Sequence, residues 1–152
     1  MTVFLGGITS KYQIAAFDWT TKNYTRKATR LIEARWLSSC AVLRDKHGTV
    51  SVAVVGGQYS SDLEAWNPED GKVTTLAQLP ENNHTLYSPK LVPINDSTEL
   101  LMYGGNSRSD IMKYSSLKNS WEKVKSMLGP KCSFVVLPVE DLSCDGYPEI
   151  IT

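Results

Sequence analysis

Short runs of apolar residues that end in two glycines recur along this chain at nearly even intervals. The runs cover residues 2–5, 52–55 and 100–103, and the glycine pairs that follow them are Gly6 and Gly7, Gly56 and Gly57, and Gly104 and Gly105. A period of about 50 residues is typical of a propeller blade. The pattern therefore predicts one strand-and-turn unit that occurs three times.

An aromatic residue follows each glycine pair, and a second large apolar residue lies seven positions after the aromatic. These residue pairs are Phe17 and Tyr24, Trp66 and Val73, and Tyr114 and Trp121. Between the members of two pairs lie the turn formers Gly71 and Asn119, which tolerate positive φ. Two short strands joined by such a turn are typical of a β-hairpin. We expect the paired large residues to fill the gaps between neighbouring units.

A further apolar stretch lies between each hairpin and the strand that follows it. These stretches cover residues 36–43, 86–94 and 132–139. Four strands in up-and-down order make a propeller blade, and inner strands that neighbours cover on both sides should be continuously apolar. We therefore predict an all-β fold of four-stranded antiparallel blades, about three in number, which form an incomplete ring. The chain is expected to be one propeller region, 1–152, with repeat units of approximately 1–50, 51–98 and 99–152.

The order of apolar strand, glycine pair, aromatic residue and second large residue resembles the kelch repeat. The third unit is the most similar, with Gly104, Gly105, Tyr114 and Trp121. The second unit has Trp66 where the kelch pattern usually has Tyr, and Val73 where it has Trp. The resemblance covers nearly the whole chain and implies a kelch-type β-propeller. Kelch propellers serve as adaptors, actin binders and occasionally oxidases, so the resemblance indicates the fold more closely than the function.

Three blades are too few for a closed ring, because propellers have roughly four to eight. Residues 149–152 are interpreted as the opening of a fourth glycine strand, which brings the expected strands to thirteen. An open arc would expose the apolar face of each end blade. Two explanations remain open. Either the chain is part of a longer propeller, or two copies associate to close a six-bladed ring.

The charges of the chain balance, with 16 Lys and Arg against 16 Asp and Glu. This balance removes the usual electrostatic reason to expect nucleic acid or an anionic membrane as a partner. No apolar run approaches the roughly 20 residues of a membrane-spanning helix. Residues 22–30 include Arg26, Lys27 and Arg30, and such a charged stretch is typical of a solvated outer strand.

The cysteines and the N-terminus favour a cytoplasmic protein. Cys40, Cys132 and Cys144 form no C-x-x-C pair, so neither a zinc site nor a disulfide framework is predicted. Residue 1 is followed at once by the first repeat, without a secretory signal. Three N-glycosylation triplets, at Asn23, Asn83 and Asn95, favour the alternative of an extracellular or carbohydrate-binding propeller.

Partners of kelch propellers usually bind one face, built from the loops after the glycine pairs and the long loops between blades. On this chain the candidate partner-binding residues are Tyr12, Arg35, Tyr59, His84 and Arg108. Tyr and Arg are among the residue types most enriched at interface hot spots. The resemblance therefore implies a non-catalytic interaction module, an adaptor or scaffold that binds an unidentified protein and needs no cofactor.

The sequence offers two candidate sites with chemistry of their own. Some kelch-type propellers are copper radical oxidases, whose site needs imidazole and phenolate ligands around one metal. His47 is expected in a turn within a blade and His84 in a loop between blades, on opposite faces, so no enzyme activity is predicted. Residues 141–149 resemble a short calcium loop with Gly146 at its sixth position, and they equally fit an Asp-Gly hairpin turn.

Overall fold

The structure, a computed structural model, describes residues 1–57, 60–80, 86–106, 108–130, 134 and 136. Within these residues it has eleven strands and no helix. The strands are β1 (Thr2–Leu5), β2 (Gln13–Asp18), β3 (Asn23–Arg30), β4 (Ser39–Arg44), β5 (Val50–Val55), β6 (Leu63–Trp66), β7 (Val73–Thr75), β8 (Lys90–Ile94), β9 (Glu99–Tyr103), β10 (Asp110–Ser115) and β11 (Ser120–Ser126). The all-β fold predicted from the sequence is confirmed.

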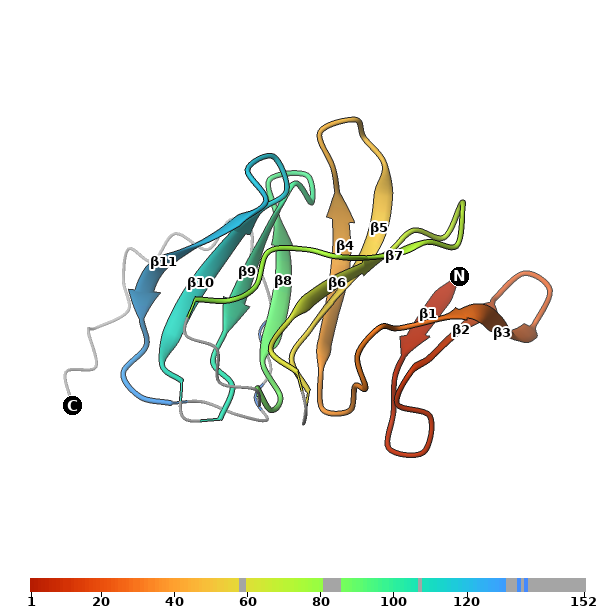
Figure 1. Ribbon diagram of the computed structural model, residues 1–152, viewed down its shortest axis with the longest axis horizontal. Helices are drawn as coiled ribbons and strands as arrows, with labels where there is room; N and C mark the ends of the chain where they lie inside the picture. Colours follow the sequence, from red (N-terminus) through yellow and green to blue (C-terminus); the bar gives the residue numbers. More distant parts are fainter. Residues whose placement is uncertain (58–59, 81–85, 107, 131–133, 135, 137–152) are drawn as a thin grey trace, which may run out of the picture.

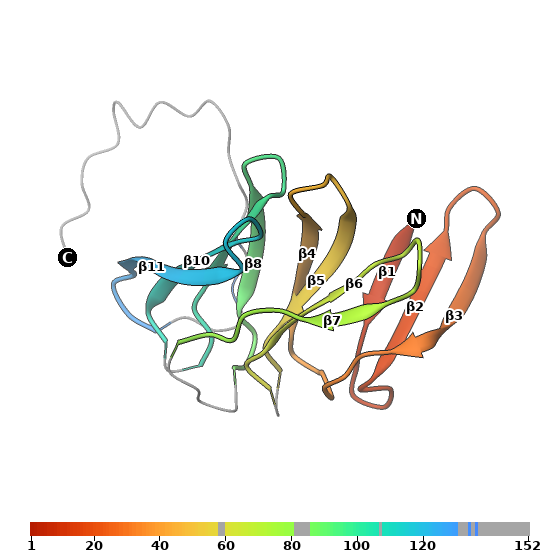
Figure 2. The same ribbon diagram turned by 45° about the horizontal axis from the view of Figure 1, so that its top comes forward.

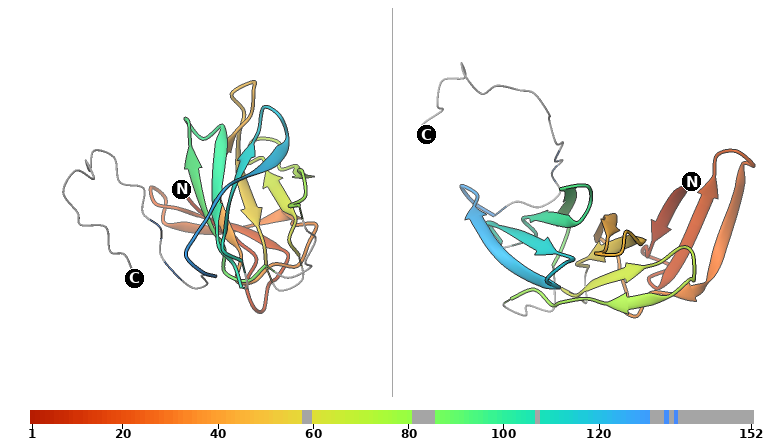
Figure 3. Two further views of the ribbon diagram at one scale, coloured as in Figure 1. Left: turned by 90° about the vertical axis from the view of Figure 1, so that its left-hand side faces the viewer. Right: turned by 90° about the horizontal axis from the view of Figure 1, so that it is seen from above.

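The strands form three antiparallel sheets that follow one another along the chain (Figure 1). The first sheet holds β1 to β3, the second β4 to β7 and the third β8 to β11. Neighbouring strands are consecutive in sequence, which is the up-and-down order of propeller blades. The sheets stand side by side and fan out into an open arc, with the first and third sheets at its ends (Figure 2, Figure 3).

Each four-stranded sheet begins with an apolar strand, β4 or β8, and the next strand, β5 or β9, ends just before a glycine pair. β4 pairs with β5 from Ser39 opposite Val55 to Arg44 opposite Val50, and β8 pairs with β9 in the same way. Among the described strands β1 has no such neighbour, so the first sheet has three strands. The strands expected at 132–139 and 149–152 fall outside the described residues, apart from positions 134 and 136.

The first two glycine pairs attach their sheets to the segment that leads into the next sheet. A Cβ at Gly6 would lie 2.2 Å from the carbonyl oxygen of Arg35, and a Cβ at Gly56 would lie 2.6 Å from that of Leu86. The N–H of the second glycine donates to the same carbonyl, Gly7 to Arg35 at 2.8 Å and Gly57 to Leu86 at 2.9 Å. The first glycine therefore permits the close approach, and the second supplies the hydrogen bond.

The large residues seven positions apart are cross-strand neighbours, so the predicted hairpins are confirmed. Phe17 lies opposite Tyr24, Trp66 opposite Val73, and Tyr114 opposite Trp121. Two positions before the second member of each pair, the chain has a positive φ, 58° at Lys22, 74° at Gly71 and 48° at Asn119. A turn of constant length at the end of each hairpin therefore produces the spacing of seven.

The sheets pack face to face, and the central strand β5 is covered on both sides. Val52 and Val54 face the first sheet, whereas Ala53 and Val55 face the third. Alternate residues of β5 therefore point to opposite faces, and the run is continuously apolar because both faces are buried. We call the two packing zones the first seam, between the first and second sheets, and the second seam, between the second and third sheets. The buried residues of the first seam are Ile14, Leu31, Val54 and Trp66, and those of the second are Leu43, Ala53, Val55, Leu63, Leu79, Leu86, Leu91, Leu100, Met102, Met112 and Tyr114.

In the second and third sheets, the pair of large residues faces the preceding sheet. Trp66 packs in the first seam with Ile14 of β2, and Tyr114 packs in the second seam with Leu43 of β4. The equivalent pair of the first sheet has no preceding sheet among the described residues. Its outer member, Tyr24, is 57% exposed, and Phe4, which contacts Tyr24 with ring centroids 6.1 Å apart, is 48% exposed. The arc therefore ends in an uncovered aromatic face.

Candidate functional site

The connections that follow the glycine pairs lie along one edge of the arc, the lower edge in Figure 1. They join β1 to β2, β5 to β6, and β9 to β10. The turns from β4 to β5, β8 to β9 and β10 to β11 lie along the opposite edge (Figure 1). Consecutive strands run in opposite directions, so every connection after a glycine pair reaches the same edge. We call this edge the loop face.

Two of the sequence-predicted partner-binding residues belong to the loop face. Tyr12 ends the connection between β1 and β2 and is 46% exposed. Arg108 lies in the connection between β9 and β10, with its guanidinium 3.7 Å from the Asp110 carboxylate. The hydrogen bond from Lys123 is the largest of the influences that hold the pKa of Asp110 below its ordinary value. Tyr59 and His84 lie outside the described residues.

Arg35, expected at the partner-binding surface, is instead buried. Its side chain has no exposed area, and its guanidinium pairs with Glu64, Nη2 to Oε1 at 2.6 Å and Nε to Oε1 at 3.0 Å. Its Nη1 donates to the carbonyl oxygen of Gly56 at 2.8 Å. In this conformation the guanidinium cannot reach a partner, because every part of it is enclosed by the first seam. The structure therefore corrects the sequence interpretation and gives Arg35 a role in holding the fold together.

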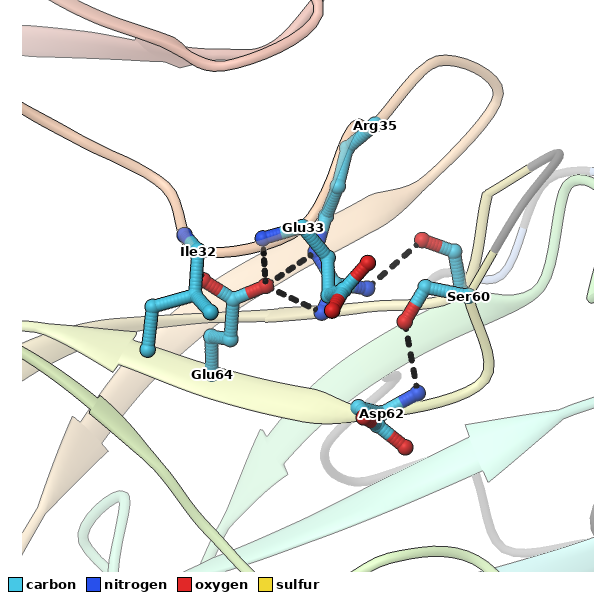
Figure 4. Close-up of polar contacts among 7 residues, drawn as sticks. Ile32, Glu33, Arg35, Ser60, Asp62 and Glu64 are labelled. Atoms are coloured by element: carbon cyan, nitrogen blue, oxygen red, sulfur yellow. Dashed lines mark hydrogen bonds and ion pairs between the residues drawn. The ribbon is translucent and has the colours of Figure 1, made fainter. Parts of the chain in front are cut away.

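Glu64 completes this buried network (Figure 4). Its carboxylate also accepts the backbone N–H of Ile32 at 2.7 Å and that of Glu33 at 3.1 Å. A buried ion pair is tolerated when further hydrogen bonds satisfy its remaining polar atoms, as they do here. The network holds the segment after β3 against β6, and the carbonyl of Arg35 is thereby presented to Gly7.

Sequence reasoning missed Glu64, although the repeat contains a signal for it. Glu64 lies two positions before the aromatic Trp66, and the residues at the same place in the other units are Ala15 and Met112. A carboxylate at a position that is otherwise apolar predicts a buried cationic partner. The sequence does not identify that partner, because Arg35 lies in a different segment of the chain, between β3 and β4.

The described part of the chain includes two grooves that are open to solvent. The first, about 450 Å³, is lined by Thr9, Ser10, Lys11, Tyr12, Gln13, Arg26, Lys27, Ala28 and Arg30. The second, about 280 Å³, lies over the second seam near the turns and includes Asp45, Asp70, Lys72, Tyr114 and Asn119. We call the first the basic groove, since all of its charged lining residues are cations.

In the second groove, Tyr114 and Asn119 form a hydrogen bond. Burial raises the pKa of Tyr114 to about 12, so its phenol is neutral at ordinary pH. The hydroxyl donates to Oδ1 of Asn119 at 2.9 Å. The described part of the chain contains no group of three His, Cys, Asp or Glu side chains placed to hold a metal ion. The calcium-loop candidate at 141–149 lies outside the described residues.

Comparison with known proteins gives a related kelch-repeat protein. An F-box/kelch-repeat protein of Arabidopsis thaliana is 32% identical over 93 residues, which are 60% of this chain and 22% of the relative. The matched region thus spans about a fifth of the relative's length. No family model matches the chain. The described residues contain no helix that is long and apolar enough to cross a membrane. Together with the three antiparallel sheets, this similarity suggests a kelch-like fold and an interaction module in general.

Proposed function

We propose that this chain is a non-catalytic protein-interaction module that binds a protein partner through the loop face, as an adaptor or scaffold does. The proposal is carried by the repeated glycine geometry, which brings connections from all three sheets to one face. Tyr12 is exposed on that face, and Arg108 lies on it. Similarity to a kelch-repeat protein supports the same interpretation.

A site-directed cross-linking experiment tests this proposal. A photoreactive phenylalanine analogue replaces Tyr12 on the loop face and, in a control, His47 in the turn at the opposite edge. We expect a protein partner from cell extract to cross-link from position 12 and not from position 47. Arg108→Ala in the position-12 protein should reduce the yield, since Arg108 lies on the same face. Equal yields from positions 12 and 47 would contradict binding through the loop face.

We also propose that a further blade or a second copy of this chain packs against the exposed aromatic face of the first sheet. Its support is the exposure of Phe4 and Tyr24, whose equivalents in the other sheets are packed against a neighbour. Sedimentation velocity separates the two occupants. Self-association should appear as a dimer that Tyr24→Glu abolishes and that Leu117→Glu, in an exposed turn, leaves intact. A monomer at every concentration would exclude the second copy.

A further inference from the structure

The basic groove lies where the connection between β1 and β2 meets the end of β3. Its charged lining residues are Lys11, Arg26, Lys27 and Arg30, and no carboxylate lines it. The chain as a whole has no net charge, but residues 2–30 hold five basic residues and one acidic residue, a local excess of four positive charges. The groove is therefore a local concentration of positive charge on a protein with no net charge.

An irregularity in strand pairing lies beside the groove. Gln13 lies opposite Arg30 and Ala15 opposite Arg26, so three residues of β3 face one residue of β2. Extra residues of this kind bend a strand and redirect its side chains. The backbone N–H of Leu31 donates to the carbonyl of Tyr12 at 2.9 Å, which ties the loop to the end of β3. The two walls of the groove are thus held together by the fold.

The cations at the β3 side of the groove are not neutralised within the described chain. Arg26, Lys27 and Arg30 form no ion pair with a described carboxylate, whereas on the third sheet Lys113 pairs with Glu122 at 2.7 Å and Lys123 with Asp110 at 2.6 Å. Internal pairing therefore engages Lys113 and Lys123 on the third sheet, whereas the three cations of β3 remain available to a partner.

β3 also offers a free backbone edge. Among the described strands it pairs with β2 alone, and it lies at the outer end of the first sheet (Figure 2). β3 is also long, with eight residues, whereas β7, the equivalent outer strand of the second sheet, has three. A free edge can accept an extended segment through main-chain hydrogen bonds. Positive charge along this edge opposes pairing with a second copy of itself and favours a segment of opposite charge.

We propose that the basic groove and the free edge of β3 bind an extended acidic segment of a partner protein. The backbone of the segment adds to β3, and its carboxylates lie against Arg26, Lys27 and Arg30. The inference deepens the proposed function by naming the chemistry of the partner, and it rests on that function because Tyr12 belongs to both surfaces.

Fluorescence anisotropy with a labelled peptide tests this inference. The probe is a capped peptide of four Glu-Val repeats, which alternates charge with a strand-forming residue. The full chain is compared with Arg26→Glu/Lys27→Glu/Arg30→Glu and with a control, Lys46→Glu/Lys118→Glu/Lys125→Glu, which changes the net charge equally at exposed sites on the other sheets. We expect the first variant to weaken binding about tenfold or more and the control to remain within about twofold of wild type. The affinity should also fall as salt rises.

A second variant, with Gln in place of Arg26, Lys27 and Arg30, removes the charges without adding acidic groups and should weaken binding too. The inference is overturned if the Glu-Val peptide does not bind, if a Gln-Val peptide binds as tightly, or if both groove variants bind like wild type. Tighter binding of a single-stranded oligonucleotide than of the acidic peptide would also overturn it. If a partner cross-links from position 12 but the peptide does not bind, the proposed function stands. Only the inference that the partner supplies an acidic segment is then contradicted.

Discussion

The two seams join similar sheets by different means. The first seam has a small apolar cluster around Trp66 and the buried ion pair of Arg35 and Glu64. The second seam has a much larger apolar cluster and no buried ion pair among the described residues. Some of its polar contacts come from the β10–β11 hairpin. Oδ1 of Asn119 accepts the N–H of Ala77 at 3.0 Å, and Nε1 of Trp121 donates to the carbonyl of Ala77 at 2.8 Å.

The difference is clearest at one position of the repeat. Arg35 and Leu86 each lie in the segment that leads from a hairpin into the next sheet, and each presents its carbonyl to the glycine pair of the preceding unit. In the first seam this segment is held by an ion pair, and in the second by the burial of Leu86, which is 1% exposed. The same backbone connection can therefore be secured by a salt bridge or by apolar packing.

The largest expected effect comes from breaking the ion pair on one side. Glu64→Ala should lower the free energy of unfolding by about 3–5 kcal/mol, because it leaves the guanidinium of Arg35 buried without a counter-charge. Urea denaturation monitored by tryptophan fluorescence measures the change. A loss of less than about 1 kcal/mol would show that the network is not what secures the first seam.

The matched control converts the first seam into the second. Arg35→Leu/Glu64→Met places at these positions the residues found at the equivalent ones, Leu86 and Met112. Replacement of a buried ion pair by apolar residues of similar size is often neutral or stabilising. We expect the double variant to recover most of the stability lost in Glu64→Ala. A double variant as unstable as the single one would show that the two seams are not interchangeable.

The next effect tests what the seams share. Gly6→Ala should lower the free energy of unfolding by about 1–3 kcal/mol, because the new Cβ would meet the Arg35 carbonyl at a positive φ of 74°. Gly48→Ala is the control, since Gly48 has a similar φ of 83° and no atom within 4 Å of its Cβ position. The difference between the two variants in thermal unfolding measures the close approach itself. Equal losses would show that glycine is required at position 6 only because of its positive φ, and not because of the nearby carbonyl.

The repeat made much of this architecture predictable, because it repeats backbone geometry. Glycine pairs, the spacing of seven and the apolar run of β5 each follow from local turns or from period-two burial, which a single sequence displays. The ion pair of Arg35 and the bulge in β3 were not predictable in the same way. Arg35 is paired by a contact between distant segments, the bulge is a local departure from regular pairing, and neither leaves a periodic signal. An exposed position was therefore expected for Arg35, whose charge is in fact buried.

A smaller effect concerns the turn at the end of each hairpin. Asn119→Gly keeps the positive φ but removes the oxygen that accepts hydrogen bonds from Ala77 and Tyr114. We expect a loss of about 1–2 kcal/mol in the free energy of unfolding, since the N–H of Ala77 loses its partner. Lys22→Gly, at the equivalent turn of the first sheet, has no seam contact to lose and should leave stability unchanged or slightly raised. A similar loss in both variants would place the role of Asn119 in the turn and not in the second seam.

The last comparison uses pH, because the aromatic residue of the second seam titrates and its counterpart Trp66 does not. Burial raises the pKa of Tyr114 to about 12, above its ordinary value of 10. Between these values the unfolded chain loses the phenolic proton and the folded chain keeps it, so the free energy of unfolding should fall as pH rises from 10 to 12. The expected slope is at most about 1.4 kcal/mol per pH unit. Tyr114→Phe should have a shallower slope over this range in urea denaturation. If Tyr114→Phe kept the full slope, the alkaline loss of stability would belong to groups outside the second seam.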